Sequence, residues 1–223
     1  MENYTDHTVE IKQYDFDIIE IIKEGWQRME GVKGALVSAF AIYVVIAIAV
    51  QLVLGIIFPS PADNPDLANQ TIVTILSYPA LMPLLTGMIM MAIRYVRGES
   101  IVFQDVFGYY GMTWTLALAA LLIYVMTVAG LLFFILPGIY LSVAYIFTLP
   151  LIADKGMGVW DAMELSRKTV TQHWFKLFGL MILLSLGMMA GFLTLGIGLI
   201  WAVPLMLITL YGLLYPIMFE IKR

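Results

Sequence analysis

The sequence predicts an all-α polytopic membrane protein, a bundle of six transmembrane helices, from its composition, its uncharged stretches and the placement of its basic residues. Hydrophobic residues make up 61% of the 223 residues, and charged residues only 13%. A soluble domain has about 45–50% apolar and about 25% charged residues, so this composition is typical of a membrane protein. The chain has no cysteine, which excludes disulfides, thiolate catalysis and cysteine-based metal sites.

Four long stretches carry no charged residue: 34–62, 67–93, 106–153 and 177–219. A helix needs about 20 apolar residues to cross a bilayer, so the first two stretches hold one helix each. The last two are too long for one helix and must fold back as hairpins, which we expect to turn at Pro137-Gly138 and at Gly196-Ile197-Gly198. The spans expected are about 34–58, 71–95, 113–135, 137–153, 176–195 and 199–219.

The basic residues predict which side of the membrane each end occupies. All 12 Lys and Arg residues fall between Lys12 and Lys33, at Arg94 and Arg97, between Lys155 and Lys176, or at Lys222-Arg223. With six spans these four places lie on one face, and the positive-inside rule makes that face cytoplasmic. Both termini are then cytoplasmic. No cleavable signal peptide is recognisable, because the first 33 residues are rich in charge, so we expect the first span to direct its own insertion.

Before the first span, residues 1–14 are polar and aperiodic and predict a mobile cytoplasmic tail, with residues 15–221 forming one membrane domain. Residues 15–30 predict an amphipathic interfacial helix that Asp15 caps. Its expected apolar stripe consists of Ile18, Ile19, Ile22, Trp26 and Met29. A lone histidine in the tail, His7, is interpreted as solvated, because no second metal ligand stands at a usable spacing.

A second amphipathic helix is expected at 158–175, on the cytoplasmic side. Val159, Met163, Val170 and Trp174 share one face, and the opposite, water-facing side carries Asp161, Glu164, Arg167 and Lys168. Glu164 stands three and four residues before the two bases, the spacing of helical ion pairs. Tryptophan is enriched at the membrane interface, so the interfacial anchors we predict are Trp26, Trp160 and Trp174.

Each even-numbered span carries two prolines and each odd-numbered span none. Proline removes a backbone donor, and nearby hydroxyls or a neighbouring helix must satisfy the freed carbonyl. Hydroxyls on these spans can do that, which is the interpretation favoured here, or can line a cavity or lipid groove; the candidates are Tyr78, Thr86, Tyr140, Ser142 and Tyr145. A Gly187-x-x-x-Gly191 motif permits a close helix crossing, within the chain or between subunits.

An aromatic residue near an acid precedes each odd span, at Phe16-Asp17, at Phe103-Gln104-Asp105 and at Trp160-Asp161. Together with the alternation of prolines, this pattern suggests a weak threefold repeat of an interfacial segment followed by a membrane hairpin. Chance similarity among apolar segments is the alternative.

The sequence carries none of the common catalytic motifs: it has no phosphate-binding glycine loop, no HExxH, no GxSxG and no acidic metal loop. No charged residue falls inside a predicted span, which disfavours an ion-coupled transporter. We therefore expect a protein that is not an enzyme, with no cofactor and no bound metal. Its net charge of −4 offers no surface for nucleic acid.

The stretch LPGIYLSVAYIFTLPLIADKGMGVWDAMELSRKTVTQHWFKLFGL (136–180) and the earlier EGWQRMEGVKGAL (24–36) resemble a bacterial family of six-span membrane proteins whose function is unknown. That family is similar to the membrane domain attached to some glycerophosphodiester phosphodiesterases. The resemblance implies a six-helix protein of the bacterial inner membrane. The resemblance covers the membrane domain and not a phosphodiesterase catalytic domain, so we expect no catalytic residue to carry over.

These observations lead to two functional hypotheses. The first is a non-enzymatic module in envelope homeostasis that interacts with membrane lipids or with a partner, either a second copy of the chain or another membrane protein. The alternative is a transporter or channel for a small neutral or amphipathic molecule that uses the even spans as mobile elements.

Overall fold

The computed structural model describes residues 13–59 and 67–220, and within these ranges it is helical, with no β-strand. Six apolar stretches of these residues are long enough to cross a membrane, which confirms the all-α membrane bundle. In chain order the elements are α1 (Ile18–Met29), α2 (Lys33–Ile57), α3 (Leu67–Val96), the short 3₁₀ turns η1 (Phe103–Phe107) and η2 (Tyr110–Met112), α4 (Thr113–Phe133), α5 (Ile135–Ala144), α6 (Thr148–Lys155), α7 (Val159–Thr171), α8 (Trp174–Leu193), α9 (Leu199–Met206), the π-helix η3 (Leu207–Leu213) and α10 (Leu214–Phe219).

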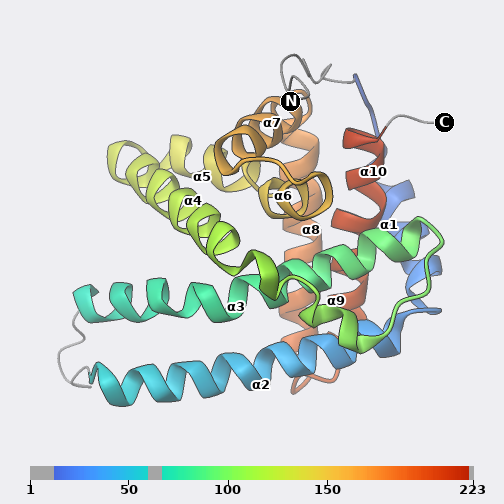
Figure 1. Cartoon of the computed structure of the whole chain (residues 1–223). Coiled ribbons are helices and arrows are strands. Elements are labelled where there is room, and N and C mark those ends of the chain that lie inside the picture. The colour runs from blue at the N-terminus through green and yellow to red at the C-terminus, as the bar shows by residue number, and fades with distance from the viewer. Residues whose placement is uncertain (1–12, 60–66, 221–223) are drawn as a thin grey trace, which may run out of the picture.

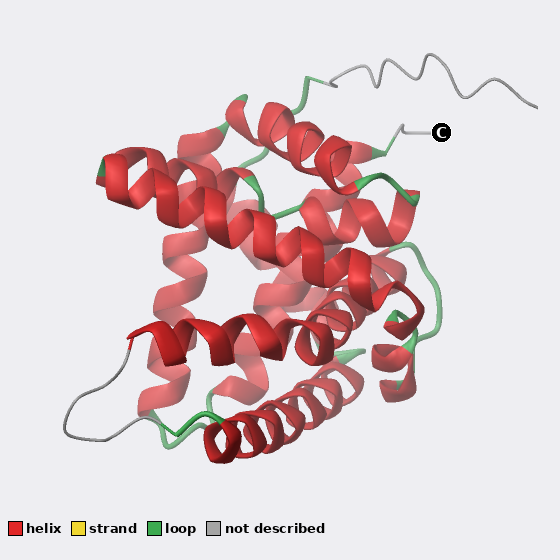
Figure 2. Cartoon of the chain, turned by 60° about the vertical axis from the view of Figure 1, so that its left-hand side comes forward, coloured by secondary structure: helices red, strands yellow, loops and turns green. Residues whose placement is uncertain are grey.

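We name the six apolar stretches membrane segments one to six: α2, α3, α4, α5–α6, α8 and α9–η3–α10. Consecutive segments form hairpins one, two and three. Figures 1 and 2 show that the three hairpins diverge, so that the turns of hairpins two and three lie far from each other and from the outer ends of α2 and α3. The end at which the hairpins converge carries Arg97, Asp154 and Glu220, and we call it the charged face.

Burial separates the even segments from the odd ones. In the most apolar window of segments two, four and six, 44%, 50% and 67% of the residues are buried, against 0%, 17% and 22% in segments one, three and five. The even segments therefore form the inner layer of the bundle and the odd segments the outer layer.

Glycines of the inner segments allow neighbouring backbone to approach closely. A Cβ placed on Gly87 of α3 would lie 2.1 Å from the carbonyl oxygen of Val106 in η1, and one on Gly212 of η3 would lie 3.0 Å from the carbonyl oxygen of Ala92 in α3. At Gly87 backbone atoms alone are in the way, and at Gly212 the side chain of Val96 lies as close as the backbone of Ala92, so a larger residue at either site would push α3 and its neighbour apart.

Prolines mark the irregular parts of two inner segments. Segment four is interrupted between Ala144 and Thr148, one turn before Pro150, whose missing N–H and bulky ring disturb the preceding turn. Segment six contains the π-helix η3, which lies between Pro204 and Pro216. π-Helical turns are rare and occur frequently at functional sites.

The structure corrects several details of the sequence predictions. The cap of α1 is Asp17, whose carboxylate accepts hydrogen bonds from the backbone of Ile19 and Glu20, and not Asp15. Hairpin two turns at Phe134, with Pro137 and Gly138 already inside α5, because an extended residue reverses the chain without a Pro-Gly turn. Hairpin three turns where we expected, with Gly196 at φ +83°.

The face of α1 that packs on protein coincides only in part with the apolar stripe predicted for the membrane interface. Ile21, Gly25 and Met29 are buried, whereas Ile19 and Trp26 are exposed. A Cβ on Gly25 would lie 2.1 Å from Thr209 Oγ1, so α1 packs tightly on η3. In the predicted tail, residues 1–12 lie outside the described residues, but Tyr14 is buried, and its hydroxyl donates to the carbonyl of Thr169.

Candidate functional site

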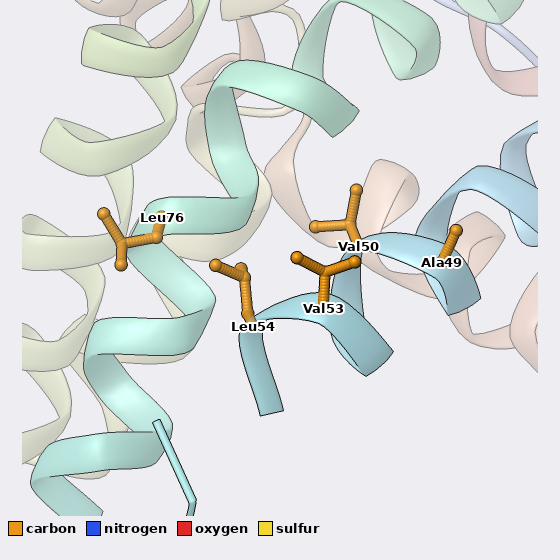
Figure 3. Close-up of a pocket in the computed structure, with 5 residues that line it drawn as sticks. All are labelled: Ala49, Val50, Val53, Leu54 and Leu76. Carbon is orange, nitrogen blue, oxygen red and sulfur yellow. The ribbon is translucent and has the colours of Figure 1, made fainter. Parts of the chain in front are cut away.

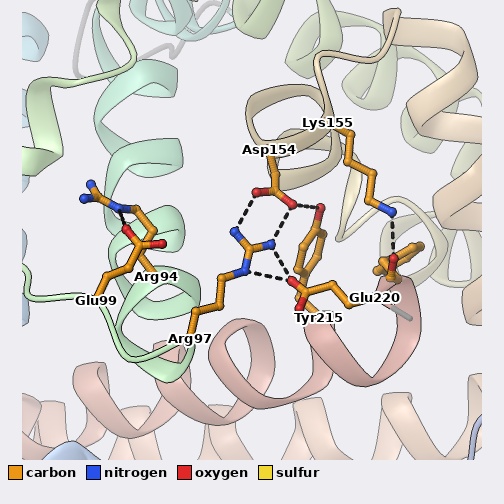
Figure 4. A network of polar contacts seen from close by, with 8 residues as sticks. Arg94, Arg97, Glu99, Asp154, Lys155, Tyr215 and Glu220 are labelled. Atoms are coloured by element: carbon orange, nitrogen blue, oxygen red, sulfur yellow. Dashed lines mark hydrogen bonds and ion pairs between the residues drawn. The ribbon is translucent and has the colours of Figure 1, made fainter. Parts of the chain in front are cut away.

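A network of ion pairs joins the ends of the three inner segments at the charged face (Figure 4). Arg97 follows α3, and its guanidinium donates two parallel hydrogen bonds, each 2.7 Å long, to the carboxylate of Asp154 in α6. Its Nε donates to Glu220, just after α10, over 2.8 Å. One guanidinium thus connects residues that are far apart in the sequence.

Further contacts complete the network. The hydroxyl of Tyr215 donates to Asp154 over 2.8 Å, and Lys155 donates to the backbone carbonyl of Phe219 over 2.7 Å (Figure 4). Beside it, Arg94 pairs with Glu99 at 2.6 Å. Segments four and six are therefore fastened to each other as well as to α3.

The carboxylates that surround Arg97, first of all Asp154, raise the pKa of its guanidinium above its ordinary value. The side chains of Arg97 and Asp154 are 26% and 15% exposed, so solvent screens their attraction only in part. Removing one member of a buried pair costs about 3–5 kcal/mol because the other charge is left unpaired. Partial exposure reduces that cost here to about 2–3 kcal/mol.

The amphipathic helix α7 fills the interruption in segment four. Ser166 accepts a hydrogen bond from the N–H of Phe147 and donates one to the carbonyl of Ala144, over 3.2 and 2.7 Å. The hydroxyl thereby satisfies backbone groups on both sides of the break. Phe147 is itself fully buried and packs edge-on against Tyr211 of η3, so the two irregular places touch each other.

The water-facing residues of α7 pair as their spacing predicts. Glu164 accepts two hydrogen bonds from Arg167, over 2.9 and 2.8 Å, and lies 3.3 Å from Lys168. The bonds from Arg167 lower the pKa of the Glu164 carboxyl to about 2. Asp161 lies in the first turn of the helix and is exposed.

The three predicted anchors have different environments. Trp26 and Trp160 are exposed, as an interfacial anchor requires. Trp174 is partly buried: its ring stacks on Phe178 at 4.8 Å, and its indole N–H donates to the carbonyl of Tyr140 over 3.3 Å. The exposed aromatic residue beside it is Phe175.

The hydroxyl residues that we considered for a cavity are not brought together. Tyr140 bonds to Thr171 of α7, and Ser142 is exposed and donates to the carbonyl of Ile139. Thr86 and Tyr145 are buried and Tyr78 is half-buried. None of these five lines the grooves described below.

The two glycines of the GxxxG motif also differ. A Cβ on Gly191 would lie 2.9 Å from the backbone of Gly198, so this glycine permits the close turn of hairpin three. A Cβ on Gly187 would have no heavy atom of another residue within 4 Å, and this glycine faces outward. The motif therefore does not form one continuous helix crossing inside the described chain.

An apolar groove lies between α2 and α3 of hairpin one (Figure 3). It has a volume of about 340 Å³ and is lined by Ala49, Val50, Val53, Leu54 and Leu76. A second groove between the same helices, of about 450 Å³, is lined by Gln51, Gly55, Phe58, Asn69, Gln70, Val73 and Thr74. The first offers only aliphatic side chains, and the second adds amides and a hydroxyl.

Sequence reasoning missed both the ionic network and the groove. One signal for the network was present: a charged residue lies at or next to the end of each even segment, and Arg97 is opposite in sign to Asp154 and Glu220. Among residues 13–59 and 67–220, no three His, Asp or Glu side chains are placed to hold a metal ion. No family model, curated protein or solved structure matches the chain.

Proposed function

We propose that this protein is a non-enzymatic, lipid-interacting module of the bacterial inner membrane that serves envelope homeostasis. The distribution of Lys and Arg supports a cytoplasmic location for the charged face and for both termini. The resemblance described above supports the bacterial membrane. The observation that carries the proposal is the apolar groove of hairpin one, which belongs to the part of the bundle least covered by protein.

The lining of the groove favours a lipid chain as its occupant. Val50, Val53 and Leu76 offer no hydrogen-bonding group, so only an apolar ligand leaves no polar group unpaired there. The α2 window is 0% buried in protein, so the groove opens toward the hydrocarbon of the bilayer. Gln51 and Gln70 in the second groove provide donors and acceptors suited to a polar headgroup.

Photo-crosslinking tests this proposal. Protein reconstituted with a phosphatidylethanolamine that carries a diazirine on one acyl chain is irradiated, digested and mapped by mass spectrometry. We expect strong labelling of α2 and α3 around Val50 and Leu76, and at least a threefold loss in Val50→Trp, which fills the groove. Leu183→Trp on the exposed surface of α8 is the matched control and keeps the labelling of hairpin one.

Two results would contradict the proposal: equal labelling of all membrane segments in the wild type, or equal effects of the two tryptophan variants. Protection of the groove by a copurified protein would instead assign it to a partner helix.

Transport of an amphipathic molecule is the second candidate, because segment four is discontinuous and segment six has a π-helix. Discontinuous helices line the binding sites of many transporters. The mutual packing of the even segments speaks against a path between them. Dithionite bleaching of a fluorescent phospholipid in proteoliposomes distinguishes the candidates, since a transporter of lipids increases the bleached fraction above that of protein-free vesicles.

A further inference from the structure

The helix α1 runs beside hairpin three from the base of the hairpin to a point close to its turn. At the base, Asp15 pairs with Lys176, the third residue of α8, at 2.5 Å. In the middle, Gly25 contacts Thr209 of η3. Just beyond the far end of α1, the amine of Lys33, the first residue of α2, lies 5.0 Å from the ring centre of Trp201, which closely follows the turn. Figure 1 shows the same arrangement, with α1 alongside α9.

The outer surface of α1 is strongly charged. Glu24 and Arg28 form an exposed ion pair on α1, and just after the helix Glu30 pairs with Lys33, the first residue of α2, at 3.0 Å. Exposed charges of this kind cannot be placed across the hydrocarbon of a bilayer without a large cost. A helix with one charged and one apolar face lies in the plane of the interface instead. α1 stays beside hairpin three along most of the helix. We therefore expect hairpin three to lie at nearly the same depth in the membrane as α1.

Hairpin one has the opposite character. Figure 1 shows α2 leaving the end of α1 steeply, across the direction of hairpin three. α2 has 25 residues and α3 has 30, about 37 and 45 Å of helix, which exceeds a hydrocarbon core of about 30 Å. Its connection, PSPADNPD (59–66), carries Asp63 and Asp66, which need water. The lengths of its helices and the charges of its connection therefore indicate that hairpin one crosses the bilayer.

The turn of hairpin three is built to stay inside the membrane. Leu195 is 96% exposed, and Thr194 is the one hydroxyl-bearing or charged side chain from Gly191 to Trp201. Its hydroxyl donates to the carbonyl of Gly191 and accepts from the N–H of Gly198, over 2.8 and 3.0 Å. The N–H groups of Gly196 and Ile197 donate to carbonyls of the same turn. A turn surrounded by lipid needs such internal hydrogen bonding.

We infer that hairpin three, residues 174–219, is a re-entrant hairpin: it lies in the leaflet of the charged face beneath α1, does not cross the bilayer, and contacts acyl chains at its turn. Both ends of the chain remain on one side, because a re-entrant hairpin and a crossing hairpin return the chain to the same face. This inference goes beyond the proposed function and does not require the groove of hairpin one.

Single cysteines test it, since the natural chain has none. Leu195→Cys and Ile197→Cys report the turn of hairpin three, Pro59→Cys reports the far end of hairpin one, and Gln172→Cys reports the charged face. Each variant is treated with a membrane-impermeant maleimide in right-side-out and in inverted vesicles, and then in detergent with denaturant to establish full labelling.

We expect Pro59→Cys to be labelled from one side, Gln172→Cys from the other, and neither turn cysteine to be labelled from the side that labels Pro59→Cys. Labelling of Leu195→Cys from that side, at a rate within threefold of Pro59→Cys, would overturn the inference.

A thiol in an apolar environment reacts slowly with maleimide even when it is accessible. A second measurement therefore does not depend on thiol reactivity. A nitroxide at position 195 is placed in liposomes whose nickel-chelating lipid lies in one leaflet only. Stronger relaxation by nickel in the leaflet of the charged face supports the re-entrant hairpin, and stronger relaxation by nickel in the opposite leaflet refutes it. A nitroxide at position 59 gives the reverse result in the same preparation and serves as the control.

Discussion

The inner membrane segments are less apolar than outer segments one and three, and they are stabilised in a different way. The inner segments two, four and six are about half buried or more, carry the prolines, and end in the network around Arg97. The outer segments one, three and five are mostly exposed and regular. Outside water there is little hydrophobic gain from helix association, so close packing and polar contacts must hold the inner layer together.

The comparison explains where irregular backbone is tolerated. In a helix that faces lipid, every backbone N–H and C=O group must find its hydrogen-bond partner within the helix. In an inner helix, side chains of neighbouring helices can supply such partners. The interruption in segment four uses Ser166 of α7 in this way. The outer helix α2 is mostly exposed along its length and contains no proline.

The largest effect is expected at the network that fastens the inner segments. Arg97→Ala leaves the carboxylates of Asp154 and Glu220 without the guanidinium and should lower the free energy of unfolding by about 2–3 kcal/mol. Arg28→Ala is the control, because its i,i+4 pair with Glu24 is exposed and contributes about 0.3–0.5 kcal/mol. Thermal unfolding in detergent, followed by tryptophan fluorescence, measures both. Equal losses of unfolding free energy in the two variants would mean that the network stabilises the inner segments no more than an exposed ion pair does.

A smaller effect is expected from adding one methyl group to an inner or an outer glycine. Gly87→Ala forces the new Cβ against the backbone carbonyl of Val106 and should cost about 1–3 kcal/mol. Gly187→Ala meets open space and replaces glycine by the best helix former, so it should be neutral or stabilise by up to about 1 kcal/mol. The same thermal unfolding measurement applies. A destabilised Gly187→Ala would reveal an interface at this surface that a second copy of the chain covers.

Much of the fold could be predicted from the sequence, because charge gaps locate apolar helices directly. The predicted span 34–58 corresponds to α2 at Lys33–Ile57, and 113–135 corresponds to α4 at Thr113–Phe133. The orientation of each helix about its own axis was harder. Facing lipid and facing protein both select apolar side chains, so the stripe predicted for α1 does not separate Met29, which is buried in protein, from Ile19 and Trp26, which are exposed.

The candidate site could be predicted less well, for a related reason. The pairing of Arg97 with Asp154 and Glu220 depends on which segment ends meet, and that is a tertiary property which no local spacing encodes. The pairing of Glu164 with Arg167 and Lys168 is local to one helix turn and was predicted correctly. The groove between α2 and α3 depends on how two apolar helices cross, which their apolar composition leaves open.

The smallest effect is expected at the interruption of segment four. Ser166→Ala removes both hydrogen bonds of a fully buried hydroxyl and leaves the N–H of Phe147 and the carbonyl of Ala144 without that partner, which should cost about 1–2 kcal/mol. Ser142→Ala, on segment four itself, is the matched control: its hydroxyl is exposed and bonds to the carbonyl of Ile139, so its loss should be within about 0.5 kcal/mol. Hydrogen exchange adds a local readout, because amides between 144 and 150 should exchange faster in Ser166→Ala while those of α2 keep their rate. Unchanged exchange rates in segment four of Ser166→Ala would contradict this prediction. The interruption would then be stable without the hydrogen bonds that Ser166 of α7 supplies.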